Sequence, residues 1–389
     1  MADFFASLKR RTSDYGNEQP IREEIFSVER LEQYAQTLAA EHRIVRKKGR
    51  AYLLPRLENN GRKLVAAYRT LVEALRSGRS ISPAAEWLVD NFHIIEEQLR
   101  EIREDLPKSY YYELPKLSDG ELKDYPRIYA VAIALIAHTD SRLETNTLRK
   151  FIAAYQMVSP LTIGELWAVA ISLRLALVEN LRRLATRIVG AREEREQADQ
   201  LADKLLELAA RQPPELVPII TERLGKRDRL PRSFVVQLTQ RLREQDPALM
   251  PVTDWLEKQL ARQGTNIEQV IHREHQRQAA TQVTIGNIIT SMRLLSTLDW
   301  RDFFESVSLI DPLLGKDPAD AYLKMEFGSR DRYRHVVERI SKRTLFTELE
   351  IGEAAVMIAA KASNGGKNGG PQAHVGYYLV DDGLVQLEA

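Results

Sequence analysis

The run SPLTIGELWAVAISLRLALVENLRRLA (Ser159–Ala185) decides the fold class. Thr162 and Glu165 have the spacing of a capping box, in which each side chain accepts a hydrogen bond from the other residue's backbone N–H. The residues that follow, to about Val189, are apolar almost all round, which is typical of a helix at the centre of a bundle. The run therefore predicts a helical protein built around this segment.

Helical signals continue on both sides of this run. Ser82 is placed to cap a helix with Pro83 at its first position, and a buried stripe then runs to Leu106. Thr265 with Glu268, and Thr347 with Glu350, repeat the capping-box spacing. Further helices are expected over 28–44 and 53–75.

Strand-like alternation is nearly absent. Only Val375–Val380, followed by Asp381, Asp382 and Gly383, indicates the start of a β-hairpin. We therefore predict an all-α fold, a multi-helix bundle of long amphipathic helices, with a short β-hairpin start at the C-terminus.

Composition changes along the chain suggest its organisation. Ala191–Leu208 is dense in charge and reads as an exposed helix, and Pro213-Pro214 then favours a boundary near residue 212. The run SNGGKNGGP (363–371) has the composition of a flexible linker. The predicted parts are a flexible N-terminus (1–25), helical sub-domains 1 (26–211) and 2 (212–362), the linker, and the start of a truncated following element (372–389).

Composition also excludes several classes of protein. The 389 residues include 56 Lys and Arg and 55 Asp and Glu, so the net charge of +1 offers no field that would attract nucleic acid. There is no cysteine, which removes disulfides, thiolate zinc sites and cysteine nucleophiles. The most apolar segment, 163–178, contains Glu165 and Arg174, so we expect no membrane span within this chain.

Three charged or metal-ligating residues stand out. Arg174 lies inside the apolar helix, so it predicts a buried structural charge that needs a partner from another helix, with Asp140 or Asp90 as candidates. His272 and His275 are three residues apart and share a helix face, which makes them weak candidates for a metal site with Glu268 as a third ligand. A solvated charged face at a helix start is the simpler explanation of the two histidines.

Several long runs, in order, together resemble the N-terminal region of cyclic β-1,2-glucan synthases, which are very large inner-membrane enzymes of Gram-negative bacteria. The runs are LLPRLENN (53–60), ISPAAEWLVDNFHIIEEQLREIREDLP (81–107), YYYELPKL (110–117), YPRIYAVA (125–132), AHTDSRLE (137–144), SPLTIGELWAVAISLRLALVENLRRLA (159–185), EHQRQAATQVTIGNIITSMRLLSTLDWRDFFESVSLID (274–311) and HVGYYLVDDG (374–383).

The resemblance implies a helical region on the cytoplasmic side of the bacterial inner membrane. In the family, a glycosyltransferase module of the same polypeptide uses UDP-glucose and a divalent metal to extend a β-1,2-glucan, and a phosphorylase-like module controls its length. The motifs of these modules match no position here, so we assign no catalytic residue and no cofactor to this chain. The chain ends at Ala389, which suggests either a fragment or a gene that ends early.

The leading hypothesis is thus a non-catalytic scaffold or regulator of the glycosyltransferase module, with β-1,2-glucan as a further candidate partner. A charged face beside aromatic residues suits a polar interface. The candidate interaction surface consists of Glu97, Arg100, Arg103, Asp105, Tyr110 and Tyr111. Two alternatives stay open at this point: a stand-alone helical adaptor, and a metal-dependent enzyme that uses His272 and His275.

Overall fold

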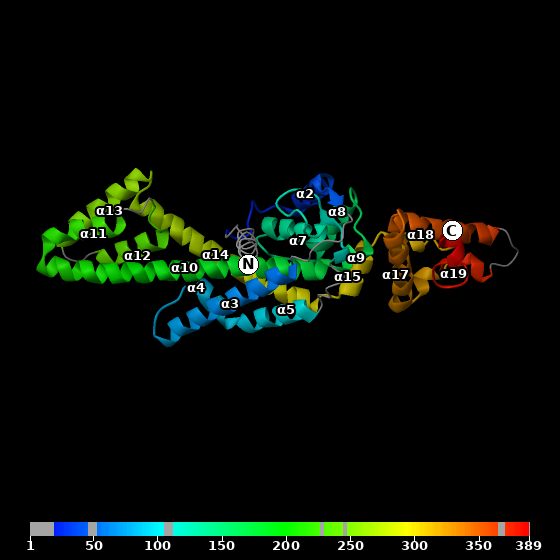
Figure 1. Cartoon of the computed structure of the whole chain (residues 1–389), viewed down its shortest axis with the longest axis horizontal. Helices are drawn as coiled ribbons and strands as arrows, with labels where there is room; N and C mark the ends of the chain where they lie inside the picture. Colours follow the sequence, from blue (N-terminus) through cyan, green and yellow to red (C-terminus); the bar gives the residue numbers. More distant parts are fainter. Residues whose placement is uncertain are drawn as a thin grey trace, which may run out of the picture. The chain divides into compact units, whose positions relative to one another are not determined.

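The computed structural model describes residues 19–45, 53–104, 112–225, 229–243, 247–364 and 370–388 (Figure 1). Within these residues the regular structure is helical apart from one two-stranded sheet, so the predicted all-α fold is confirmed. The sheet pairs β1 (Ile44–Val45) with β2 (Lys116–Leu117) in antiparallel register, with Ile44 opposite Leu117 and Val45 opposite Lys116. None of the described helices combines the length and apolar composition that a membrane crossing requires.

The described helices, in chain order, are α2 (Val28–Glu41), α3 (Leu53–Arg76), α4 (Pro83–Asp90), α5 (Phe92–Glu104), α7 (Arg127–His138), α8 (Thr145–Gln156), α9 (Ile163–Trp167), α10 (Val169–Arg211), α11 (Leu216–Leu224), α12 (Arg232–Leu242), α13 (Met250–Arg262), α14 (Ile267–Thr297), α15 (Trp300–Val307), α16 (Ile310–Leu314), α17 (Phe327–Arg343), α18 (Glu348–Asn364), α19 (Val375–Val380) and α20 (Leu384–Glu388). Short 3-10 turns are η1 (Pro213–Glu215), η2 (Pro247–Leu249), η3 (Tyr322–Lys324) and η4 (Pro371–Ala373).

The chain divides into two compact units, each assembled from segments that are distant in sequence. Unit 1 comprises Met1–Ile21, Arg56–Leu99 and Val178–Thr290, and unit 2 comprises Arg22–Pro55, Arg100–Leu177 and Ser291–Ala389. The sub-domains predicted over 26–211 and 212–362 stay a prediction. Residues 1–18 of the predicted flexible N-terminus and 365–369 of the predicted linker lie outside the described residues.

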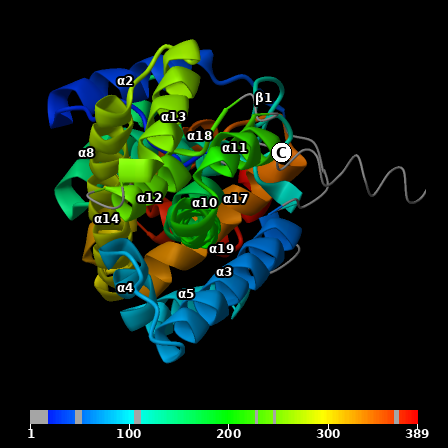
Figure 2. The same cartoon turned by 90° about the vertical axis from the view of Figure 1, so that its left-hand side faces the viewer.

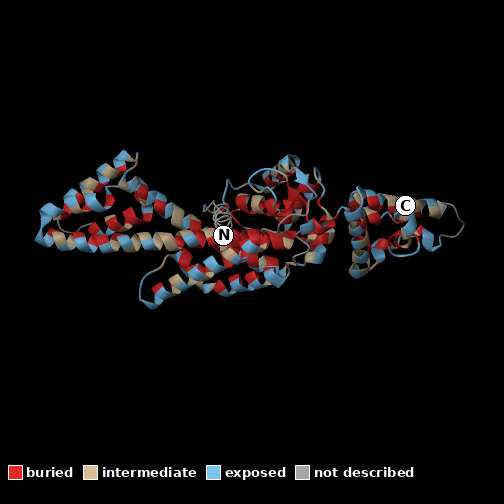
Figure 3. Ribbon diagram, in the orientation of Figure 1, coloured by how far each residue is buried: buried red, intermediate tan, exposed pale blue. Residues whose placement is uncertain are grey.

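Unit 1 has a core at the C-terminal half of α10, where α11, α12 and α13 cover it (Figures 1 and 2). Ala198, Leu201, Leu205 and Ala209 of α10 are buried there, at helical spacing. Buried positions recur along this stretch in Figure 3. The expectation of an exposed helix over Ala191–Leu208 is therefore wrong for one face, because small and apolar residues recur between the charges.

The helix predicted over 83–106 begins as expected but is broken once. The Ser82 hydroxyl accepts a hydrogen bond from the Ala85 N–H, so the predicted cap is present. Asn91 then separates α4 from α5, and its side chain donates to the Trp87 carbonyl over 2.9 Å. An asparagine side chain competes in this way with the helical hydrogen bonds of the backbone.

In unit 2 the capping box of Thr162 and Glu165 is present at the start of α9. The predicted apolar helix is interrupted at Ala168 and then continues as α10, which runs 43 residues to Arg211. The box of Thr347 and Glu350 also forms. The capping box predicted from Thr265 and Glu268 does not form. Asn266 takes the capping role instead, and its side-chain Oδ1 accepts a hydrogen bond from the Gln269 N–H.

The predicted C-terminal hairpin is wrong: Val375–Val380 forms helix α19, which packs with α17 and α18. Val375, Tyr378 and Leu379 are buried at spacings of three and four residues. For such a short apolar run, periodicity alone cannot distinguish a buried helix from a strand. The start of α19 is held by Asp317, whose carboxylate accepts the Val375 N–H over 3.0 Å.

Candidate functional site

The predicted interaction surface lies partly on α5. Glu97, Arg100 and Arg103 are exposed and follow one another at intervals of three residues. The opposite face of this helix carries buried residues such as Ile95 and Ile102. Three members of the predicted surface, Asp105, Tyr110 and Tyr111, lie outside the described residues.

Arg174 is buried, with 8% of its surface exposed. Its Nη2 lies 2.9 Å from Glu101 Oε2 on α5 and 3.2 Å from the Leu295 carbonyl. Glu101 was not among the partners that the sequence suggested, and Asp140 lies 3.3 Å from Arg22 instead. The sequence could indicate the need for an acidic partner but could not name it.

His272 and His275 lie on α14, as expected, and both are exposed. His272 Nε2 is 2.9 Å from the side-chain nitrogen of Gln276. Across the part of the chain that the structure describes, no three His, Asp or Glu side chains are grouped as metal ligands would be. The metal site proposed on these two histidines and Glu268 therefore has no structural support.

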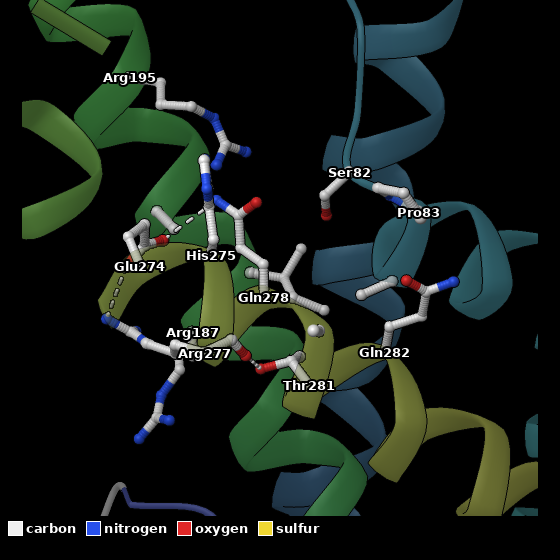
Figure 4. A pocket seen from close by; sticks show the side chains of 14 residues that line it. Ser82, Pro83, Arg187, Arg195, Glu274, His275, Arg277, Gln278, Thr281 and Gln282 are labelled. Carbon is white, nitrogen blue, oxygen red and sulfur yellow. Dashed lines mark hydrogen bonds and ion pairs between the residues drawn. The ribbon is translucent and has the colours of Figure 1, made fainter. Parts of the chain in front are cut away.

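His275 does line a cavity of about 240 Å³ in unit 1 (Figure 4). Arg195 of α10 and His275 and Gln278 of α14 line one side, and Ser82 and Pro83 at the start of α4 lie on the other. An adjoining hollow of about 200 Å³ shares all five of these residues, together with Glu274. Three helices from distant parts of the sequence thus meet around one recess that carries several charged and amide side chains.

Glu274 is the buried acid of this recess, with 2% of its surface exposed. Its Oε1 accepts hydrogen bonds from the Ser233 hydroxyl over 3.1 Å and from Gln278 Nε2 over 3.2 Å. Its Oε2 has no hydrogen-bond partner, and the nearest cation to it is Arg277 Nη1 at 3.7 Å. One carboxylate oxygen is therefore left available as an acceptor.

Three arginines line the same cavity, and each is held differently. Arg187 donates to the Gln19 side chain, and Arg277 faces Glu274. Arg195 is partly buried and makes no hydrogen bond or ion pair with any described residue. Burial lowers the pKa of Arg195, with Glu274 and Glu194 acting in the opposite direction.

Glu179, an acid of unit 1 that is 1% exposed, has several cationic and amide partners. Arg56 donates to it through Nε and Nη2 over 3.0 and 2.9 Å, and Asn60 donates over 2.7 Å. Arg182 and Arg183 add bonds of 3.0 and 2.8 Å. Burial alone would raise the pKa of Glu179, but the surrounding guanidinium charges and hydrogen bonds lower it far below its usual range.

Unit 2 has a comparable buried pair. Arg127, 1% exposed, donates to both carboxylate oxygens of Glu165, over 2.8 and 2.5 Å. Burial, helped by the charge of Arg127, lowers the pKa of His42 to about 4. His42 Nδ1 lies 2.9 Å from the hydroxyl of Tyr155, whose pKa burial raises to about 12.

Sequence reasoning missed Arg195 and Glu274, although a signal for both was present. Arg195 precedes Ala198 by three residues, so it lies on the face of α10 that becomes apolar. Glu274 follows Val270 by four residues and continues the buried side of α14. A charged residue in line with an apolar stripe is a candidate for a buried or partly buried role.

Comparison with known proteins adds one relative. No protein-family model matches the chain. Over 336 residues the chain is 34% identical to the cyclic beta-(1,2)-glucan synthase NdvB of Rhizobium meliloti (strain 1021). The aligned region covers 86% of this chain but only 12% of that protein. The resemblance predicted from the sequence runs is thereby confirmed.

Proposed function

Because this chain is related in sequence to a segment of a cyclic β-(1,2)-glucan synthase, we propose that it serves as a non-catalytic helical region of such an enzyme. It would act as scaffold or regulator of the glycosyltransferase module, on the cytoplasmic side of the bacterial inner membrane. The module would supply the chemistry with UDP-glucose and a divalent metal. The observation that carries the proposal is the match over 86% of this chain to 12% of the relative.

The way the chain uses its buried charges supports a structural role. Glu179 is enclosed by Arg56, Arg182 and Arg183, and Arg127 is bound by Glu165. Groups that are saturated by fixed partners stabilise one arrangement of helices, and they are poorly placed to exchange protons with a substrate. These clusters thus fit a rigid support better than a catalytic centre.

The exposed face of α5 supports contact with another module. Glu97, Arg100 and Arg103 present both signs of charge to solvent, while the other side of the helix is anchored by buried Leu99 and Ile102. An interface outside an obligate core is typically polar and hydrated, and arginine is enriched in it. We assign this face, called the α5 surface below, as the contact with the transferase module.

The test uses a full-length synthase that contains this region. Replacing Arg100 and Arg103 by alanine should lower β-1,2-glucan synthesis from UDP-glucose about two- to fivefold, the effect of losing two exposed charged contacts. The matched control is Lys258→Ala with Arg262→Ala, since these cations are equally exposed on α13. Normal synthesis by the α5 variant, or an equal loss in the control, would remove the contact assignment.

A further inference from the structure

The recess around Arg195 and Glu274 contains two groups of opposite charge that have hydrogen-bonding capacity left. Arg195 has five N–H donors and no hydrogen bond or ion pair with a described residue. Glu274 Oε2 is a buried acceptor without a hydrogen bond. Both residues line both of the adjoining hollows. Leaving a buried polar atom unpaired is costly, which applies to Glu274 Oε2. The partly buried guanidinium of Arg195 lines the same recess, so one ligand can reach both groups.

The charge of the lining indicates what that ligand carries. Three arginines and one glutamate line the larger hollow, so its potential favours an anion. A guanidinium binds phosphate or carboxylate oxygens through parallel N–H donors. Glu274 Oε2, in contrast, can only accept, so a ligand hydroxyl beside the anionic group would complement it.

The size of the recess fits a small molecule. A hollow of about 240 Å³ exceeds by many times the roughly 15 Å³ that one water needs. The polar side chains of Gln278, Gln282 and Ser82 also line it. In unit 2 another cavity of about 240 Å³ includes Arg127, but all three guanidinium nitrogens of that residue already have partners.

We propose that this recess of unit 1 binds a small hydroxylated anion, a sugar or polyol that carries a phosphate or carboxylate group. Arg195 pairs with the anionic group, and Glu274 Oε2 accepts a hydrogen bond from a ligand hydroxyl. Gln278, which donates to Glu274 Oε1, keeps the carboxylate in position. This assignment does not rest on the relation to glucan synthases.

Titration calorimetry on the 389-residue chain tests the site. The probes are glucose 1-phosphate, gluconate, inorganic phosphate and glucose. One of the first two should bind more tightly than phosphate or glucose alone, and which of them binds identifies the anionic group. If neither binds, or if inorganic phosphate binds as tightly as both, the proposal of a hydroxylated anion is overturned.

Two variants locate the binding. Arg195→Gln should lower the affinity for the probe that binds by at least about tenfold, because a charge-assisted contact is lost. This change orphans no described partner, so the fold should be retained, which circular dichroism checks. Glu274→Gln replaces the free acceptor by an amide, and should remove the preference over inorganic phosphate. Unaltered affinity in Arg195→Gln would overturn the site.

The matched control is Arg211→Gln, which removes an arginine from the same helix. Arg211 is exposed at the end of α10 and pairs with Glu207 over 2.9 Å. Its replacement should leave the affinity unchanged. A loss equal to that of Arg195→Gln would show that the probe responds to overall charge and not to the recess.

Discussion

At the scale of single residues, Glu179 makes the strongest prediction about stability. Its neutralisation by Glu179→Gln removes the carboxylate charge with which Arg56, 8% exposed, and Arg182, 2% exposed, both pair. Breaking a buried ion pair from one side typically costs about 3–5 kcal/mol, because a buried charge remains uncompensated. We expect the urea midpoint of unfolding to fall accordingly. As a control, Glu207→Gln removes only an exposed contact with Arg211 and should shift the midpoint little.

His42 makes stability depend on pH. Its pKa in the folded chain is about 4, below the ordinary 6.5, so the unfolded chain binds the proton more readily. The contribution of neutral His42 to the free energy of unfolding is complete above pH 6.5. It is lost as the pH falls from 6.5 toward 4. Allowing for solvent screening of a partly exposed group, the loss is about 1–2 kcal/mol.

Unfolding in urea at pH 7.0 and pH 4.5 measures this contribution against His42→Gln. The glutamine can keep a hydrogen bond to Tyr155 but does not titrate. The variant should lose less stability between the two pH values than the original chain. An identical loss in both proteins would show that other groups account for the acid sensitivity.

At the scale of elements, two helices begin with the same motif in different surroundings. Glu165 at the start of α9 is fully buried and pairs with Arg127, whereas Glu350 in the first turn of α18 is exposed. Glutamine keeps the capping box in either place. Glu165→Gln should nevertheless destabilise by about 3–5 kcal/mol, because the charge of Arg127 is left uncompensated. Glu350→Gln should change the unfolding midpoint little, and similar effects of the two would contradict the burial argument.

The sequence predicted those helix features correctly that depend only on residues close together in the chain. Ser82, Thr162 and Thr347 act within one helical turn, so the sequence predicted their caps correctly. The break at Asn91 depends on whether a side chain turns back to the Trp87 carbonyl, which composition does not reveal. The C-terminal helix α19 depends on burial against α17 and α18, which no local pattern contains.

At the scale of the whole molecule, long-range pairing is what the sequence could not supply. The Arg56–Glu179 pair joins residues 123 apart in sequence, and Ser233 bonds Glu274 across 41 residues. Periodicity predicted that Arg174 lies in a buried helix, but Glu101 is selected by the packing of α5 against α10. The same limit hid the recess, because its arginine and its glutamate lie on different helices.

The α5 surface makes a prediction for association between this chain and the remainder of a synthase polypeptide supplied separately. Contacts through exposed Arg100 and Arg103 should weaken as salt is raised, since screening at 1 M shortens the Debye length to about 3 Å. As NaCl is raised from 0.05 to 1 M, the affinity should fall about tenfold or more. In the double variant Arg100→Ala with Arg103→Ala, the affinity should depend less steeply on salt. The opposite result, binding that salt leaves unchanged, would favour an apolar contact instead. Leu345 and Phe346, 99% and 61% exposed between α17 and α18, would then carry it, and their replacement by serine would abolish binding.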